Sequence, residues 1–105
     1  MPELNKTYSV YNGNKTAVIE ISEDAVGLNN FNSLSESVLQ EIDNGLKYFI
    51  FDMSKINSIN SSGLGILIGC LKKIKEKNGY LKIINLNEKI ISIFKLTKLD
   101  NVFEF

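Results

Sequence analysis

The segment that decides the fold is LKYFIFDM, residues 46–53, a run of aromatic and branched side chains without helical periodicity. A short apolar run between turn-forming residues is typical of a strand buried in the middle of a sheet. An Asn-Gly pair precedes this run, and the polar stretch SKINSIN, residues 54–60, follows it. We therefore expect a central strand, followed by a loop that Ile56 and Ile59 anchor to the core.

Helical periodicity lies on both sides of this strand. Residues 61–77 contain the clearest apolar stripe, formed by Leu64, Leu67, Ile68, Leu71 and Ile74. Residues 31–42 carry a similar stripe, formed by Phe31, Leu34, Val38 and Ile42. Each helix is followed by an Asn-Gly pair, Asn44-Gly45 or Asn78-Gly79, and we expect the pair to supply the residue that turns left-handed and ends the helix. A strand-helix-strand order predicts a crossover connection between parallel strands.

The two ends of the chain predict further strands. Residues 7–11 and 16–22 flank Asn12-Gly13, a strong signal for an antiparallel hairpin. Residues 80–86 predict another strand, and the tail, residues 102–105, predicts an edge strand.

A last helix is predicted after the strand at residues 80–86. Asn87 would cap this helix, and the side chains expected to face inward are Ile90, Ile93, Phe94 and Leu96. The sequence therefore predicts a single α/β domain over residues 1–105. We expect a mixed sheet of four to five strands with an N-terminal antiparallel hairpin, packed with about three helices.

Composition argues against several classes of function. Lys plus Arg and Asp plus Glu both number 12, so the chain lacks the basic excess typical of nucleic-acid binding. The chain has no histidine and no phosphate-binding glycine loop, which disfavours an enzyme and predicts neither a cofactor nor a metal site. One cysteine excludes an internal disulfide, and no apolar run approaches roughly 20 residues. We therefore expect a cytoplasmic protein without a signal peptide or membrane insertion.

The stretch from residue 49 to residue 105 resembles the STAS family (sulphate transporter and anti-sigma factor antagonist). Its most specific part is IFDMSKINSINSSGLGILIGCLKKIKEKNGYLKIINL, residues 50–86. In that family a strand ending in Asp, here Asp52, is followed by a loop and then by Asp-Ser-Ser/Thr-Gly-Leu-Gly at a helix start. Those motif positions read Asn60-Ser61-Ser62-Gly63-Leu64-Gly65 here. Residues 94–100 also look like the family's last helix and turn, with Lys98 where glycine is usual.

The resemblance implies an anti-sigma factor antagonist. Such a protein binds an anti-sigma factor, which is commonly also a serine kinase, and thereby frees a sigma factor. Phosphorylation of the first motif serine, Ser61 here, would release the partner, and a serine phosphatase would reset the cycle. Asn60 replaces the family's usual aspartate and lacks its carboxylate. A second interpretation is therefore a non-phosphorylated STAS subunit that docks on the ATPase of an ABC-type lipid transporter.

Elementary chemistry leaves several roles open along this motif. A phosphate at a helix start is stabilised by unpaired amides but would obstruct a docked partner. Serine is also a preferred N-cap, so Ser61 is either a cap or a phosphoacceptor. Gly63 and Gly65 either admit a close partner backbone or pack tightly on the sheet.

The same choice between structure and binding applies beside the motif. Ile66 and Cys70 are either buried or part of an apolar docking patch. Asp52 either borders the docking surface or caps the turn that follows its strand. The predicted phosphoacceptor is Ser61, and the oligomeric state stays open. The predicted partner-binding residues are Asp52, Asn60, Ser62, Gly63, Leu64, Gly65 and Ile66.

Overall fold

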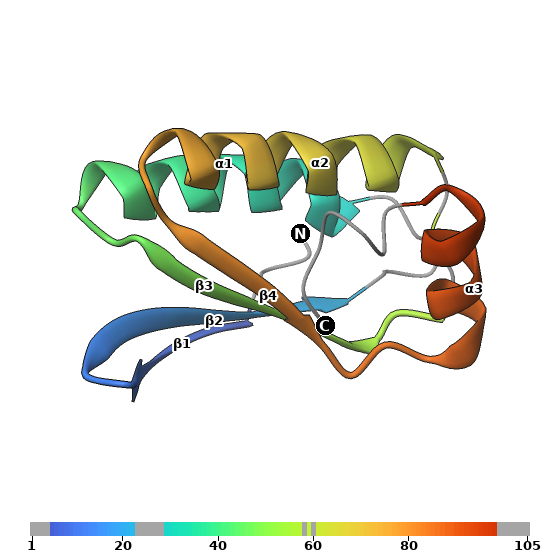
Figure 1. Ribbon diagram of the computed structural model, residues 1–105, viewed down its shortest axis with the longest axis horizontal. Coiled ribbons are helices and arrows are strands. Elements are labelled where there is room, and N and C mark those ends of the chain that lie inside the picture. Colours follow the sequence, from blue (N-terminus) through green and yellow to red (C-terminus); the bar gives the residue numbers. More distant parts are fainter. Residues whose placement is uncertain (1–4, 23–28, 58, 60, 99–105) are drawn as a thin grey trace.

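The computed structural model describes residues 5–22, 29–57, 59 and 61–98. The elements follow the order β1 (Asn5–Tyr11), β2 (Asn14–Ser22), α1 (Asn29–Asp43), β3 (Tyr48–Lys55), α2 (Ser61–Glu76), β4 (Tyr80–Ile84) and α3 (Glu88–Leu96). Helices α1 and α2 lie side by side over one face of the sheet, and α3 lies at one end of it (Figure 1). The predicted α/β architecture is confirmed, whereas the edge strand predicted at residues 102–105 lies outside the described residues.

The sheet is mixed and has the strand order β1-β2-β3-β4. Strands β1 and β2 form the predicted antiparallel hairpin, whose turn residues Asn12 and Gly13 have φ values of 52° and 81°. Two consecutive residues with positive φ suit the right-handed twist of a tight hairpin. Strand β3 runs parallel to both β2 and β4, as the crossover helices between them require.

The core lies between the sheet and its helices. On β3, Phe49, Phe51 and Met53 are fully buried, and they alternate with side chains on the opposite face. Ile56 and Ile59 are 1% and 8% exposed, so the predicted anchoring of the loop after β3 is confirmed. The other fully buried apolar side chains come from both sheet and helices: Ala17, Ile19, Ile21, Leu34, Val38, Leu67, Cys70, Ile74, Ile83, Ile90 and Phe94.

One core prediction is wrong in α3. Ile90 and Phe94 are fully buried, but Leu96 is 85% exposed. Residues four positions apart share a helix face, whereas Leu96 lies two positions after Phe94, about 200° around the helix. Leu96 therefore points away from the sheet.

The two long helices end differently, although Asn-Gly follows both. Gly45 has a φ of 91°, and its amide donates to the carbonyl of Ile42 at 2.9 Å, as predicted. After α2, the left-handed residue of the pair is Asn78, with a φ of 59°, so the predicted helix end is confirmed there too. Gly79 is needed for space instead, because a Cβ atom there would lie 2.5 Å from the carbonyl oxygen of Lys47.

A polar cluster joins β1 to α1. Glu41 is 4% exposed and forms an ion pair with Lys6, whose Nζ lies 2.7 Å from Glu41 Oε2. Lys6 Nζ also donates to Ser37 Oγ at 2.9 Å, and the Tyr8 hydroxyl donates to the Glu41 carboxylate. Burial alone would raise the pKa of Glu41, but the bonds from Lys6 and Tyr8 outweigh it and the pKa is lowered. The ionised carboxylate thus tethers the hairpin to the helix.

We expect Glu41→Gln to lower the free energy of unfolding by roughly 1–3 kcal/mol near pH 7, because charged hydrogen bonds are lost. A carboxyl group with a lowered folded-state pKa stabilises the fold above its unfolded pKa and loses this effect as pH falls through the folded value. The difference in the free energy of unfolding between the variant and the wild-type chain should therefore shrink on acidification to about pH 3. Urea unfolding at both pH values measures it.

The control for this comparison is Glu36→Gln. Glu36 lies on the same helix but is exposed, so its loss should change stability by less than about 0.5 kcal/mol. A destabilisation by Glu41→Gln that stayed constant down to the acidic pH would contradict the tether.

Candidate functional site

The predicted site lies where β3 and β4 end and α2 begins. Parallel strands place their carboxyl ends at one edge of a sheet, and the loop after Lys55 leads from this edge to Ser61. Helix α3 follows the end of β4 at this same end of the molecule (Figure 1). The loop after β3, the start of α2 and α3 therefore share one end of the sheet.

Ser61 and Ser62 are both exposed at the first turn of α2. This first turn contains no acidic residue. The first amides of a helix lack partners within the helix, and the helix dipole favours an anion beside them. Asn60, the preceding motif residue, lies outside the described residues. The helix start therefore presents two hydroxyls to the solvent in an environment that favours negative charge.

The two motif glycines occupy different environments. Gly63 is buried, which agrees with tight packing of the helix start. Gly65 is exposed, and a Cβ atom added there would meet no heavy atom within 4 Å beyond the neighbouring helix backbone. Packing therefore explains Gly63 but not Gly65.

The apolar residues of the motif are divided in the same way. Leu64 and Ile66 are partly buried and pack against the core, so each keeps some exposed surface. Cys70 is fully buried, and this burial raises the pKa of its thiol to about 11. The burial alternative is therefore correct for Cys70. Ile66 remains half accessible beside the serines.

Asp52 caps the turn that follows it, one of the two roles that the sequence left open. Its Oδ1 accepts a hydrogen bond from the Ser54 amide at 2.9 Å and another from Asn85 Nδ2 at 3.1 Å. Burial alone would raise the pKa of Asp52, but these bonds outweigh it and the pKa is lowered. Asn85 has a φ of 60°, a conformation that asparagine tolerates well. The carboxylate thus joins the ends of β3 and β4.

Asn87 fastens the loop that leads to Ser61. Its Nδ2 donates to the carbonyl oxygens of Ile56 and Asn57, each at 3.1 Å. Its Oδ1 accepts from the Ile90 amide at 2.8 Å, which confirms the predicted cap of α3. The sequence gave no signal for the two loop contacts, because their partners lie 30 and 31 residues earlier. One side chain therefore couples α3 to the segment before α2.

Within the described ranges, no cluster of three or more His, Cys, Asp or Glu side chains could hold a metal ion. In the same residues, no helix combines the length and the apolar character that crossing a bilayer requires.

The STAS domain family model matches residues 8–105. The chain belongs to the STAS domain family. The model covers both the motif of α2 and the strands on either side of it, so the family resemblance noted in the sequence is confirmed.

Curated relatives of this STAS domain are named as anti-sigma factor antagonists. The anti-sigma-B factor antagonist of Bacillus subtilis is 33% identical over 52 residues, which are 50% of this chain and 48% of the relative. The anti-sigma-B factor antagonist of Listeria monocytogenes is 24% identical over 53 residues, which are 50% of this chain and 46% of the relative. The matched segment thus spans about half the length of these relatives.

Solved structures show the same fold. SpoIIAA, an anti-sigma factor antagonist, superposes in its unphosphorylated form with a TM-score of 0.70 and 15% identity, covering 92% of this chain and 84% of SpoIIAA. The phosphorylated form of SpoIIAA, from Bacillus, gives a TM-score of 0.68 at 15% identity, covering 96% of this chain and 89% of that one. The protein TM1081 gives 0.75 at 24% identity, covering 91% and 75%.

We expect Asn87→Asp to separate the two roles of Asn87. The aspartate keeps the oxygen that caps α3 but has no amide to donate to the loop carbonyls. Amide hydrogen exchange should therefore become faster in residues 54–57 while α3 stays protected. Asn87→Ala should lose both roles and destabilise the STAS domain by about 1–2 kcal/mol.

Lys89→Ala, an exposed change on the same helix, serves as the control and should alter stability by less than about 0.5 kcal/mol. Unchanged loop exchange in both Asn87 variants would mean that the two carbonyl contacts do not hold the loop.

Proposed function

We propose that this STAS domain is an anti-sigma factor antagonist that binds an anti-sigma factor with serine kinase activity. Phosphorylation of Ser61 would release the partner, and a serine phosphatase would restore binding. The observation that carries this proposal is an exposed Ser61 at the start of α2, within the family motif. The names of the Bacillus and Listeria relatives support it.

The local chemistry supports a charge switch at this position. A phosphate would add about −1.5 to −2 charge and three acceptor oxygens. Because the first turn of α2 has no acidic residue, the helix itself would not repel the group. A partner that docks on the helix start would either have to desolvate this anion or be repelled by it. The modification is therefore tolerated by the fold and rejected by the interface.

We place the partner surface around the exposed part of the motif. Ser61, Ser62 and Gly65 are exposed there, and Leu64 and Ile66 contribute partly buried apolar surface. Buried Gly63 would lie behind this surface and shape it. Asp52 and Asn60 complete the proposed set of partner-binding residues. A small apolar patch surrounded by polar groups is a common composition for a transient interface.

Ser61→Glu should weaken binding to the anti-sigma factor by about tenfold or more, roughly 1.4 kcal/mol, because it places a negative charge at the helix start. Ser61→Ala should bind normally but accept no phosphoryl group from the kinase and ATP. Calorimetry measures the affinity, and the intact mass of the chain reports phosphorylation.

Ser92→Glu is the matched control, since Ser92 is an exposed serine within helix α3. It should leave the affinity within about twofold. Equal affinities of wild-type chain and Ser61→Glu for the anti-sigma factor would refute the switch.

Asn60 favours a second candidate function, because it lacks the carboxylate usual at this motif position. In that case the chain is a non-phosphorylated STAS subunit that docks on an ABC-type transporter ATPase. Co-purification from native cells distinguishes the two candidates. An anti-sigma factor in the complex supports the first, and an ABC ATPase with unmodified Ser61 supports the second.

Gly65→Ala should raise stability and lower partner affinity at the same time. Replacing an unobstructed glycine inside a helix by alanine stabilises a protein by about 0.5–1 kcal/mol. The added methyl group would nevertheless hold the partner backbone away from the helix. Gly69→Ala is the matched control, since a Cβ atom at Gly69 also meets no heavy atom within 4 Å beyond the neighbouring helix backbone.

The control should gain stability and keep its affinity, because Gly69 lies one turn further from the helix start. Thermal unfolding and calorimetry provide the two measurements. Wild-type affinity in Gly65→Ala would show that no partner backbone comes close at this position.

A further inference from the structure

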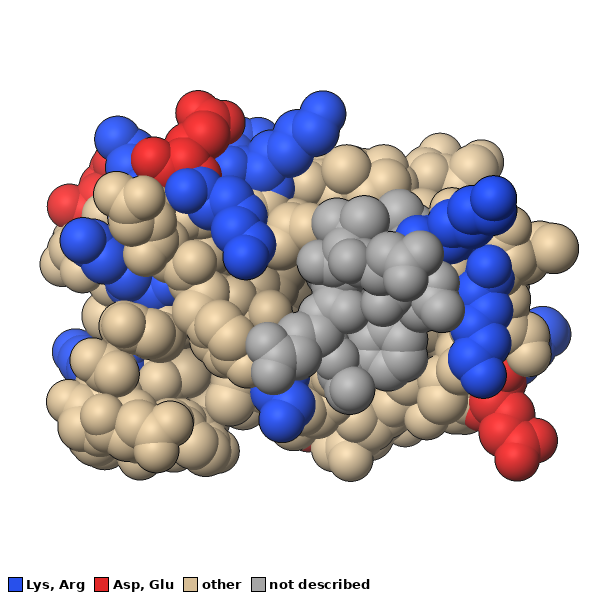
Figure 2. All heavy atoms as spheres, viewed as in Figure 1, with Lys and Arg blue, Asp and Glu red and all other residues tan. Residues whose placement is uncertain are grey.

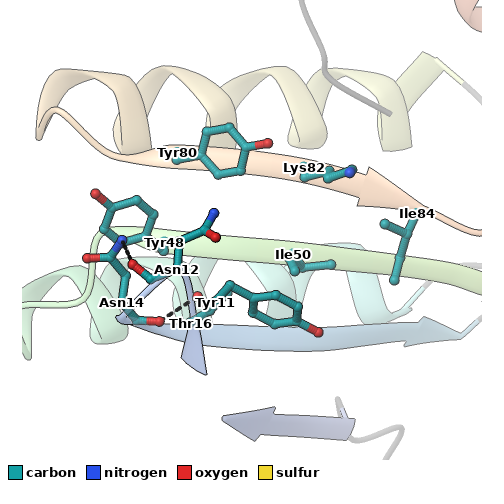
Figure 3. Close-up of a pocket in the computed structure, with 9 residues that line it drawn as sticks. All are labelled: Tyr11, Asn12, Asn14, Thr16, Tyr48, Ile50, Tyr80, Lys82 and Ile84. Atoms are coloured by element: carbon teal, nitrogen blue, oxygen red, sulfur yellow. Dashed lines mark hydrogen bonds between the residues drawn. The ribbon is translucent and has the colours of Figure 1, made fainter. Parts of the chain in front are cut away.

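The face of the sheet that α1 and α2 leave open carries a groove. Side chains alternate along a strand, so Phe49 and Phe51 face the helices while Tyr48 and Ile50 face the other way. Figure 3 shows Tyr48 and Ile50 on β3 beside Tyr80, Lys82 and Ile84 on β4. The β1–β2 hairpin contributes Tyr11 to the same groove. All four strands and the hairpin turn therefore line one cavity.

The lining of this groove is largely aromatic and apolar. Tyr48 and Tyr80 pair across β3 and β4, with ring centroids 6.3 Å apart and planes tilted by 43°. Ile50 is only 7% exposed between the strands, and Tyr11 is 49% exposed at the hairpin. An aromatic ring that packs against such a side chain gains about 0.5–1.5 kcal/mol for each aromatic pair. The lining therefore favours an aromatic ligand.

Its volume, about 450 Å³, falls within the range of roughly 300–1,000 Å³ that is typical of sites for small molecules. The hairpin wall is held in shape by short-range bonds. Asn14 Nδ2 donates to the Asn12 carbonyl at 3.4 Å, and Thr16 Oγ1 donates to the Asn14 carbonyl at 3.1 Å (Figure 3). A preformed wall reduces the conformational entropy that a ligand must overcome.

The groove carries positive charge. Among the described residues, Lys82 is the only charged one that lines it, and no described carboxylate forms an ion pair with this lysine. The carboxylates of Glu20 and Asp52 are engaged elsewhere, Glu20 with Lys55 at 4.0 Å and Asp52 with Asn85. An ammonium group beside aromatic walls complements a ligand that joins a ring to a negative group.

Charged side chains of both signs are mixed on the surface of the molecule. Figure 2 shows lysine and acidic side chains spread in small mixed groups over the visible face, without one extended field of either sign. A long polyanion such as a nucleic acid needs an extended basic surface, whereas a single anionic group needs one cation. The charge pattern therefore favours a small anion.

We propose that this groove binds a small planar aromatic anion. The ring of the ligand lies against Tyr48, Tyr80 and Tyr11, and its carboxylate or sulfonate meets the ammonium group of Lys82. Tyr48 is the first residue of β3, whereas Asp52 lies close to the other end. The aromatic part of the groove therefore lies away from the surface around Ser61, and only Ile84, the register partner of Asp52, approaches that end of the sheet. A ligand site here goes beyond the proposed partner switch.

Two dyes that differ by one charge test this site. Anilinonaphthalene sulfonate supplies an aromatic system with a sulfonate, and phenylnaphthylamine supplies the same aromatic system without it. We expect saturable binding of the sulfonate to the folded wild-type chain with one site per chain. Lys82→Gln should lower the affinity for the sulfonate by about tenfold, roughly 1.4 kcal/mol. The affinity for the neutral dye should stay within about twofold of the wild-type value.

Tyr11→Ala should lower the affinity for both dyes, because it removes an aromatic side chain from the groove and leaves the Lys82 ammonium group in place. Lys72→Gln, at an exposed lysine of α2, is the matched control and should change neither affinity. Urea unfolding of each variant establishes that the dyes meet folded protein. Amide chemical shifts perturbed by the sulfonate should cluster around residues 48–50 and 80–84.

Three results would overturn the proposal. The first is a lack of saturable sulfonate binding to the folded chain. The second is an equal loss of affinity for both dyes in Lys82→Gln, which would mean that the charge of Lys82 plays no part in binding. The third is a set of shifted amides in α2 or α3 in place of β3 and β4, which would locate the dye at another surface.

Discussion

Strand β3 is the element on which the rest of the structure depends. It is the only described strand with a parallel neighbour on each side, and Phe49, Phe51 and Met53 are fully buried beneath the helices. Parallel neighbours require long crossovers, and α1 and α2 supply them. Both helices cover the same face of the sheet (Figure 1), and neither covers the opposite face. The burial of one side of β3 therefore determines where the core, the open face and the loop ends lie.

Much of this arrangement could be predicted because its signals are local. The apolar run at residues 46–53 indicated a central strand, and Asn12-Gly13 indicated the hairpin. The helix ends were harder. Gly79 has to be small because the Lys47 carbonyl lies beside it, and that neighbour belongs to a segment about 30 residues earlier. Spacing within the sequence does not reveal contacts of this kind, so it did not show which residue of the Asn78-Gly79 pair turns left-handed.

The candidate site was predictable to a similar extent. The family motif located Ser61 at the helix start, and the structure confirms that position. The contrast between buried Gly63 and exposed Gly65 depends on how α2 is rotated over the sheet, which the motif alone does not specify. The two bonds from Asn87 to the loop were missed because an N-cap asparagine already has a sufficient local explanation. Side chains with a second, distant partner are those that sequence reasoning misses.

The way in which the loop is held bears on how a switch at Ser61 could work. Ile56 and Ile59 anchor the loop by burial, and Asn87 holds two of its carbonyl oxygens with an uncharged amide. None of these described contacts uses the hydroxyl of Ser61, and none involves a formal charge. An added anion at the helix start would therefore alter the surface potential while leaving the anchors in place. A phosphate at Ser61 would then change what can dock on the domain without requiring the domain to refold.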